Sequence, residues 1–375
     1  MSLNLNKDKL DTILANFWIK GTLLHFSPLG QGHIHDTYLV EVEEANEIKK
    51  YTLQQLNTRV FQQPELMMAN WVKVTHHLSH KLMKLEGEKA IRQCLRPVST
   101  LTGQYYYRSS SGEYFRIYYY IDNCQTIETV STPDQAFEAG RAFGLFQKLV
   151  ADLPASEMHE TIPYFHHTPY RFKRFLQALD QASVEKKTKA ADVISLAFQF
   201  QPLISLVVDG LDSGCLPLRV THNDTKINNV LFDIETGQGL CVIDLDTTMP
   251  GSSLYDFGDL VRTATCPAAE DETDLSLVVM DIDLFRAVAD GYLSQTADLL
   301  TSSEKELLIQ AGLLLTYTIG LRFLTDYLEG NLYFKTKYPD HNLNRAKAQF
   351  KLLESMQAQQ REMRRVINDL LKSFD

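Results

Sequence analysis

Short apolar runs separated by turn residues dominate residues 20–122, a pattern typical of an antiparallel sheet. The strands that we predict lie within 26–40, where Gly30 and Gly32 interrupt the run, and over 51–56, 98–101, 105–108 and 115–121. Two other segments, 5–18 and 64–85, repeat apolar residues every three or four positions, as amphipathic helices do. The first third of the chain therefore predicts a small sheet accompanied by helices.

From residue 133 onward the helical period prevails. We predict helices over 133–150, 190–211, 283–294, 303–328 and 344–373, with others opening within 163–174 and at Tyr255. The pattern changes at Asp122-Asn123-Cys124, so we predict a first domain over residues 1–122 and a second over 123–375. The predicted fold class is α+β, with a small sheet-containing lobe and a larger, mostly helical lobe.

One stretch of the helical part, 221–259, returns to short strands. Residues 230–233 and 240–245 form two apolar runs joined by a turn, and Asp244 lies near the end of the second. The loop before the first run carries the polar residues of this stretch: His222, Asp224, Lys226 and Asn229. We therefore predict a β-hairpin with carboxylates and amides where its strands begin and end.

The order of these residues is the layout of kinase-type phosphoryl transfer: His-x-Asp, an asparagine five positions after the aspartate, an apolar strand, then Ile-Asp. In that chemistry Asp224 orients the acceptor hydroxyl as catalytic base, while Asn229 and Asp244 bind Mg²⁺, which prefers oxygen ligands. Aspartate and asparagine also favour turns for purely structural reasons. It is the whole set in this order that favours catalysis.

The predicted nucleotide contacts lie in the first domain. Gly30 and Gly32 allow backbone N–H groups to approach the phosphates of ATP, although a glycine pair alone is more typical of a hairpin turn. The third strand carries Gln54 where kinase-like folds place a lysine. Either another cation contacts the phosphates, with Lys226 as a candidate, or the metal neutralises more of their charge. Residues 122–124 form the predicted hinge, where adenine pairs with backbone groups.

Several other polar residues have structural interpretations. Asp256 and Asp259 fall in the first turn of a predicted helix, where acidic residues suit the helix dipole and bind neighbouring loop amides. His166 and His167 are adjacent, so their side chains point in different directions, and we predict surface or substrate contacts for them rather than a metal site.

Composition and charge narrow the classes of protein. A chain of 375 residues with a net charge of −10 fits two lobes and lacks the basic surface that nucleic acid requires. Five scattered cysteines predict reduced thiols in the cytoplasm. We also predict no signal peptide, and no apolar run that approaches a membrane span. The helix 344–373 is expected to pack on its own lobe, which predicts a monomer or a weak homodimer.

These motifs resemble the aminoglycoside-phosphotransferase and choline-kinase group of the protein-kinase-like fold, and within it the N-acetylhexosamine 1-kinases. The resemblance extends over most of the chain, and the blocks that carry it are GHIHDTY (32–38), LQQLN (53–57), FHHTP (165–169), THNDTKINNV (221–230), IDLDTTMPG (243–251), YDFGD (255–259), RFLTDY (322–327) and HNLNRA (341–346). The central block is shared by many kinases, whereas the flanking blocks resemble the subgroup.

The resemblance implies a bilobal kinase-like fold and transfer of a phosphoryl group from Mg·ATP to the anomeric hydroxyl of GlcNAc or GalNAc. It implies Asp224 as the base, Asn229 and Asp244 as magnesium ligands, and contacts of His33, Arg322 and Tyr333 with the sugar. His35 replaces the asparagine expected after Gly-His-Ile, which suggests an altered sugar preference.

Two alternatives stay open at this stage. The acceptor of a kinase of this kind is in some cases an aminoglycoside, choline or another hexose. A kinase-fold protein without catalysis is the other alternative, but such a protein normally loses one of Asp224, Asn229 and Asp244, and all three are present.

Overall fold

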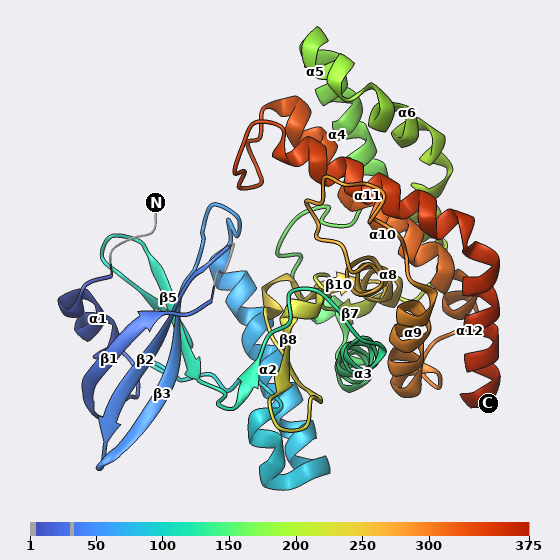
Figure 1. The fold of residues 1–375 in the computed structure, drawn as a ribbon. Helices are drawn as coiled ribbons and strands as arrows, with labels where there is room; N and C mark the ends of the chain where they lie inside the picture. The colour runs from blue at the N-terminus through green and yellow to red at the C-terminus, as the bar shows by residue number, and fades with distance from the viewer. Residues whose placement is uncertain (1–4, 31–33, 375) are drawn as a thin grey trace. The chain divides into compact units, whose positions relative to one another are not determined.

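The computed structural model describes residues 5–30 and 34–374, with the elements labelled in Figure 1. These residues divide into two units. The first comprises the chain up to Cys124 together with two later segments, His159–Ile162 and Leu245–Thr248, and the second contains the remainder. Two short segments from later in the sequence thus belong to the N-terminal unit.

The first unit is built on a five-stranded antiparallel sheet of order β1-β2-β3-β5-β4. Its strands are β1 (Thr22–Pro28), β2 (Asp36–Glu44), β3 (Glu47–Gln55), β4 (Tyr107–Arg108) and β5 (Tyr114–Tyr119). The register places Gln54 on β3 opposite Thr37 on β2 and Arg116 on β5. Neighbouring strands therefore bring an amide and a guanidinium together.

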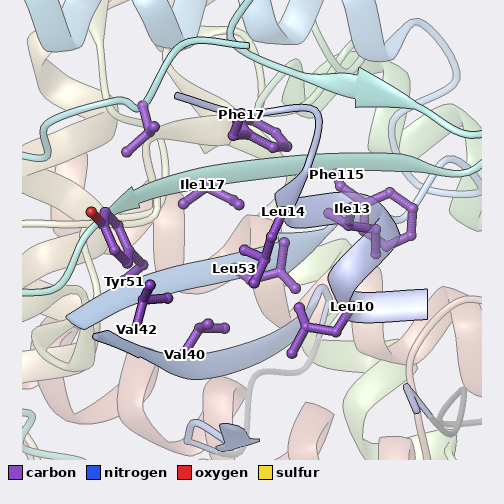
Figure 2. Close-up of a cluster of buried hydrophobic side chains, with 11 residues drawn as sticks. Leu10, Ile13, Leu14, Phe17, Val40, Val42, Tyr51, Leu53, Phe115 and Ile117 are labelled. Atoms are coloured by element: carbon purple, nitrogen blue, oxygen red, sulfur yellow. The ribbon is translucent and has the colours of Figure 1, made fainter. Parts of the chain in front are cut away.

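One face of this sheet is covered by α1 (Lys7–Leu14), as Figure 2 shows. The helix contributes Leu10, Ile13 and Leu14 to a buried cluster that the strands complete. The strand residues of the cluster are Val40, Val42, Tyr51, Leu53, Phe115 and Ile117. The sequence predicted this apolar face, although the helix is shorter than the predicted 5–18.

Helix α2 (Pro64–Glu86) matches the predicted range 64–85 and begins with proline in its first turn, where no N–H is required. Its buried residues include Met67, Met68 and Trp71, and η1 (Gly87–Arg92) follows it. The predicted strand 98–101 is wrong: Pro97 and Thr100 make only isolated bridges, to Tyr118 and Phe17. Proline has no N–H to donate to a strand ladder, which limits regular pairing there.

The second unit is mostly helical. Its helical elements are α3 (Pro133–Val150), η2 (Ala155–Glu157), α4 (Thr168–Gln181), α5 (Val184–Lys189), α6 (Ala191–Gln199), η3 (Gln201–Leu203), α7 (Leu206–Asp212), η4 (Ile227–Asn229), α8 (Ser253–Ala264), α9 (Ile282–Thr296), α10 (Ser302–Glu329), α11 (His341–Ala358) and α12 (Gln360–Phe374). The small sheet plus this helical part confirm the predicted α+β class, with a sheet-containing part and a larger, mostly helical part.

Close contact between α3 and α9 depends on glycine. A Cβ atom at Gly291 would lie 2.1 Å from the carbonyl oxygen of Phe137, and one at Gly140 would lie 2.3 Å from that of Val288. Real Cβ atoms do not approach backbone so closely, so these helices require glycine at their crossing. The predicted helix 133–150 agrees with α3 at both ends.

Helix α10 is a long, largely buried helix of the second unit. Thr301 and Glu304 form a capping box at its start, and Gly330 ends it in a left-handed conformation. Its length and composition would allow it to cross a membrane, so the prediction that no segment approaches a span is wrong. However, 83% of its most apolar window is buried inside the structure, as in the core helix of a globular protein.

Two predicted helices are each divided in the structure. The range 190–211 becomes α6, η3 and α7, because Pro202 has no N–H to continue the helical ladder. The range 344–373 is broken at Gln359. The break allows α11 to pack against α10 and α12 to pack against α9.

Candidate active site

The loop that carries the predicted catalytic residues begins after β7 (Arg219–Thr221). This strand pairs antiparallel with β10 (Met249–Gly251). It is anchored by Arg219, whose guanidinium binds both carboxylate oxygens of Glu304 at 2.7 and 2.8 Å. After the loop and η4, β8 (Val230–Asp233) and β9 (Gly239–Val242) form the predicted hairpin.

His222 holds two parts of this loop together. Its Nδ1 atom accepts the N–H of Asp224 at 3.2 Å, and its Nε2 atom lies 2.9 Å from the carbonyl oxygen of Ile243. Since a backbone N–H can only donate, Nδ1 is the acceptor and the ring proton resides on Nε2. The ring is buried against Phe143 and Phe146, so His222 is a positioning residue.

Asn229 makes the second connection. Its Nδ2 group donates to the carbonyl oxygen of Asp224 at 2.9 Å and to the Asp224 carboxylate at 3.1 Å. Its own carbonyl accepts the N–H of Ile243 at 2.9 Å. Ile243 is therefore held on its N–H by Asn229 and on its C=O by His222. The segment leading into Asp244 is thus fixed beside the loop that carries Asp224 and Asn229.

Two residues of this site have left-handed backbone conformations. Asn223 has φ of +66° and Asp244 has φ of +58°. Asn and Asp are the non-glycine residues that adopt this conformation most readily, but it still costs free energy. One of these residues precedes Asp224, and the other is itself a predicted metal ligand. Unusual backbone conformations of this kind cluster at functional sites.

The charge of Asp224 is set by competing influences. Burial raises its pKa, but the neighbouring Lys226, with Nζ 3.2 Å from Oδ1, and then His222 outweigh burial and lower the pKa. The carboxylate is therefore ionised at neutral pH, as a hydrogen-bond acceptor for a hydroxyl must be. The Lys226 side chain is 40% exposed, so its ammonium is accessible to a ligand as well as to Asp224.

The donor atoms around this loop suit magnesium better than zinc. With the Nδ2 group of Asn229 directed at Asp224, its Oδ1 atom is the one suited to a cation. Within residues 5–30 and 34–374, no group of three or more His, Cys, Asp or Glu residues is arranged to hold a metal. One amide oxygen and one carboxylate, with the balance from phosphate and water, is a typical magnesium donor set.

Asp256 supports the loop rather than reacting. Its two carboxylate oxygens accept the backbone N–H groups of His222 at 2.9 Å and Asn223 at 2.7 Å, which confirms the predicted contact with loop amides. Burial raises the pKa of Asp256 to about 6. Asp259 likewise has a structural contact, an ion pair of 2.8 Å with Arg262.

In the first unit, Gln54 is part of a buried cluster. Its Oε1 atom accepts Nε and Nη2 of Arg116 at 2.9 and 2.6 Å, and its Nε2 atom donates to Thr37. The Arg116 guanidinium also binds both carboxylate oxygens of Asp246. Burial raises the pKa of Asp246, but Arg116 and then His35 outweigh it and hold the pKa well below its usual range. Near Gln54, then, the cation is an arginine that already has a carboxylate partner.

His35 belongs to the same cluster. Its Nε2 atom lies 2.8 Å from Asp246, its Nδ1 atom accepts the N–H of Asn57 at 2.9 Å, and its ring stacks on Phe61. Both ring nitrogens are therefore engaged within the first unit. The structure gives His35 a packing role in this cluster, and an altered sugar preference stays a prediction.

The other predicted nucleotide contacts are only partly visible. Gly30 has φ of +70° and lies in a turn after β1. Gly32 and the predicted sugar contact His33 lie outside the described residues. At the predicted hinge, the carbonyl oxygens of Asp122 and Asn123 accept Nη2 of Arg92 at 2.8 and 3.0 Å. Strand β6 (Cys124–Gln125) starts where the first unit ends.

A pocket of about 170 Å³ in the second unit contains both remaining sugar candidates, Arg322 and Tyr333. The residues that line it are Tyr170, Arg171, Arg174, Arg322, Thr325, Asp326, Glu329, Tyr333 and Phe334. The Arg322 guanidinium lies 4.9 Å from the ring of Phe165, 5.4 Å from that of Phe334 and 5.6 Å from that of Tyr333. Aromatic rings therefore hold this cation in position.

Asp326 organises the loop that supplies Tyr333 and Phe334. Its carboxylate accepts the backbone N–H groups of Leu332, Tyr333 and Phe334 at 2.7–3.0 Å, together with Nδ2 of Asn342. These four donors occupy the carboxylate. The segment after α10 is thus a loop folded around one buried aspartate.

His166 connects this pocket to the catalytic loop. Its Nε2 atom lies 2.7 Å from the carbonyl oxygen of Asn223, the residue before Asp224. Its ring contacts those of Phe165 and Tyr255. The residue is 5% exposed, so the surface position, one of the two predicted alternatives, is wrong, and a substrate contact stays a prediction. The pocket and Asp224 are therefore joined by a short chain of contacts within one unit.

Comparison with known protein families identifies the family of this chain. Residues 25–289 match APH, the phosphotransferase enzyme family. The chain belongs to this family. The match includes Asp224, Asn229 and Asp244, and it ends before α10, which contributes Arg322 to the pocket.

Solved structures of similar fold cover nearly the whole chain. A microcompartment-associated aminopropanol kinase has a TM-score of 0.59 at 14% identity, with 96% of this chain and 98% of that chain covered. A spectinomycin phosphotransferase in complex with ADP and spectinomycin has a TM-score of 0.59 at 13% identity, with 95% and 99% covered. Choline kinase from Cryptosporidium parvum has a TM-score of 0.57 at 14% identity, with 95% and 97% covered. At these identities the likeness shows a common fold.

Sequence reasoning missed three polar residues that the structure makes prominent. Arg116 and Asp246 form a buried ion pair between segments 130 residues apart, and Arg171 shares the pocket with Arg322. An arginine within an apolar, aromatic predicted strand and a second aspartate two residues after Asp244 were the available signals. Neither predicts its partner without the fold.

Proposed function

We propose that this phosphotransferase transfers a phosphoryl group from Mg·ATP to the anomeric hydroxyl of N-acetylhexosamines, GlcNAc or GalNAc, giving the sugar 1-phosphate and ADP. The observation that carries the proposal is the loop in which an ionised Asp224 is bound to Asn229 and fixed beside the segment leading into Asp244. The choice of acceptor is supported by the sequence blocks of the N-acetylhexosamine 1-kinase subgroup and by the Arg322–Tyr333 pocket.

In this proposal Asp224 accepts a hydrogen bond from the sugar hydroxyl and directs the oxygen lone pair toward the γ-phosphorus. Asn229 fixes one carboxylate oxygen, and Lys226 keeps the group ionised. The carboxylate thus holds a defined orientation before the acceptor arrives. Such positioning is the main contribution of a protein to phosphoryl transfer.

Asn229 and Asp244 would hold magnesium, which neutralises charge on the phosphates when it is bound. The exposed ammonium of Lys226 is the proposed phosphate contact from this loop. In the first unit, the backbone of Gly30 and Gly32 and the remaining N–H of Gln54 are the proposed nucleotide contacts. The Oε1 atom of Gln54 is committed to Arg116 and does not take part.

A second candidate function is phosphorylation of another small alcohol. The fold is shared with kinases of aminopropanol and choline and with a spectinomycin phosphotransferase, so the fold alone does not select an acceptor. The arginine-rich pocket disfavours cationic acceptors, which leaves another neutral hexose as the stronger form of this candidate.

The test is ADP release with Mg·ATP in the presence of GlcNAc, GalNAc, glucose, galactose, choline or kanamycin. The proposal predicts turnover that is highest with the N-acetylated sugars. It also predicts that Asp224→Asn, which preserves shape, lowers kcat by about a hundredfold or more. ATP binding without turnover of any acceptor would instead support the kinase-fold protein that lacks catalysis.

A further inference from the structure

The pocket beside the catalytic loop contains more positive charge than its acidic residues neutralise. Among the described residues that line it, Arg174 is paired with Glu329, and Asp326 is occupied by three backbone N–H groups and Asn342. Arg171 and Arg322 have no carboxylate partner in the part of the chain that the structure describes. Two guanidinium groups without a directly bound carboxylate therefore share one small cavity, in which three arginines outnumber two acidic residues.

The neighbouring contacts show that both groups are held there. Arg171 uses Nε and Nη2 to bind the carbonyl oxygen of Phe165 at 3.2 and 3.1 Å, which leaves Nη1 as a donor for a ligand. Arg322 is held by the rings of Phe165, Tyr333 and Phe334. Burial, followed by repulsion from Arg322, lowers the pKa of Arg171 to about 10, which still leaves it charged at neutral pH.

A ligand group in this cavity must meet two conditions. It must supply oxygen lone pairs, because the unpaired groups facing it are N–H donors. It must also carry no positive charge, because like charges in a poorly solvated site strongly disfavour binding. An amide carbonyl meets both conditions, whereas an ammonium group meets neither.

We propose that Arg171, acting with Arg322, is a specificity-determining residue that admits the N-acyl carbonyl of the hexosamine and excludes acceptors with a free ammonium group. This inference rests on the proposed sugar kinase activity and specifies which part of the acceptor the pocket recognises. Arg171 has this role because it supplies both an unused donor and an uncompensated charge.

The experiment compares kcat/KM for GlcNAc, glucosamine and glucose with Mg·ATP at mildly acidic pH, where the glucosamine amine is protonated. These acceptors place a carbonyl, a positive charge or a hydroxyl at the same carbon. The variants are Arg171→Met, which removes charge and donor but keeps length, and Arg171→Lys, which keeps the charge. A ratio between two acceptors on one preparation does not depend on the fraction of folded enzyme.

We expect Arg171→Met to reduce the preference for GlcNAc over glucosamine by about tenfold or more, and Arg171→Lys to retain most of the rejection of glucosamine. Because Arg171→Met also removes the donor that is proposed to bind the N-acyl carbonyl of the sugar, the preference for GlcNAc over glucose should fall as well. An unchanged GlcNAc-to-glucosamine ratio in Arg171→Met would overturn the inference alone. Absence of turnover with all three acceptors in the unmodified enzyme would overturn the proposed function, and the inference with it.

Discussion

Individual hydrogen bonds to Asp224, Asn229 and Ile243 define the candidate catalytic centre. His222 and Asn229 each contact two segments, so a change at either one affects both. The sequence motif predicted the residue types and their order. It did not reveal that His222 acts through the backbone, because a single histidine in a loop is compatible with many roles.

Asn229 offers a direct test at this scale. Asn229→Ala removes the proposed magnesium ligand and the contact that orients Asp224, so we expect lower kcat and a higher magnesium concentration for half-maximal rate. The magnesium requirement is measured by titration at saturating ATP. Asn228→Ala is the matched control, because the side-chain amide of Asn228 contacts Glu128 instead of Asp224. This variant should leave the magnesium requirement unchanged.

His166 predicts a pH dependence of stability. Burial lowers its pKa to about 4, an effect opposed by Asp259 and reinforced by Arg322 and Arg171. The unfolded chain, with a pKa near 6.5, therefore binds this proton more readily than the folded chain. The stabilising contribution of neutral His166 is complete above the pKa of the unfolded chain and is lost as the pH falls from there toward 4.

Between about pH 7 and pH 5 the loss from this one group amounts to about 2 kcal/mol. Urea unfolding at both pH values, compared with His166→Gln, isolates the effect because other groups titrate in both proteins. The free energy of unfolding of the variant should vary less over this interval. Equal pH dependence in the two proteins would contradict a buried neutral His166.

At the scale of elements, sequence periodicity located α2, α3 and β8 well because their buried residues are local and regular. It did not locate the breaks in 190–211 and 344–373. The second break follows from tertiary packing, since α11 and α12 pack against different helices. Which helix each segment packs against cannot be read from the local pattern of apolar residues.

The α3–α9 crossing predicts the effect of adding one methyl group. Gly291→Ala places Cβ within 2.1 Å of the Phe137 carbonyl oxygen, so the two helices must separate. We expect a loss of about 1–3 kcal/mol in the free energy of unfolding, measured by denaturant titration. Arg286→Ala, at an exposed position of the same helix, should change it by less than about 0.5 kcal/mol. Equal effects would contradict a close glycine-dependent crossing.

At the scale of the whole molecule, residues that are adjacent in the sequence can belong to different structural units. Leu245–Thr248 belongs to the first unit although Asp244, immediately before it, belongs to the second. The buried pair of Asp246 with Arg116 secures this segment. A boundary drawn along the sequence at 122–123 cannot represent such an exchange, because the long-range partner is invisible in a linear pattern.

This arrangement predicts a localised response to Asp246→Asn. The variant leaves the buried Arg116 without a full counter-charge, which typically costs several kcal/mol. Hydrogen exchange should accelerate in β3, β5 and α2, which contribute to the cluster, and stay nearly unchanged in α9 and α10. Asp298→Asn, which removes a surface ion pair with Lys148, is the control. Uniform acceleration in both units would show that the pair does not act locally.

The central claim is phosphoryl transfer to the anomeric oxygen of an N-acetylhexosamine, and phosphorus NMR of the product tests it most directly. The enzyme would be incubated with Mg·ATP and GlcNAc, with Asp224→Asn in parallel. We predict a sugar phosphate whose phosphorus couples to the anomeric proton, and no such product from the variant over the same time. A phosphate on any other carbon, or an equal signal from the variant, would contradict the assignment.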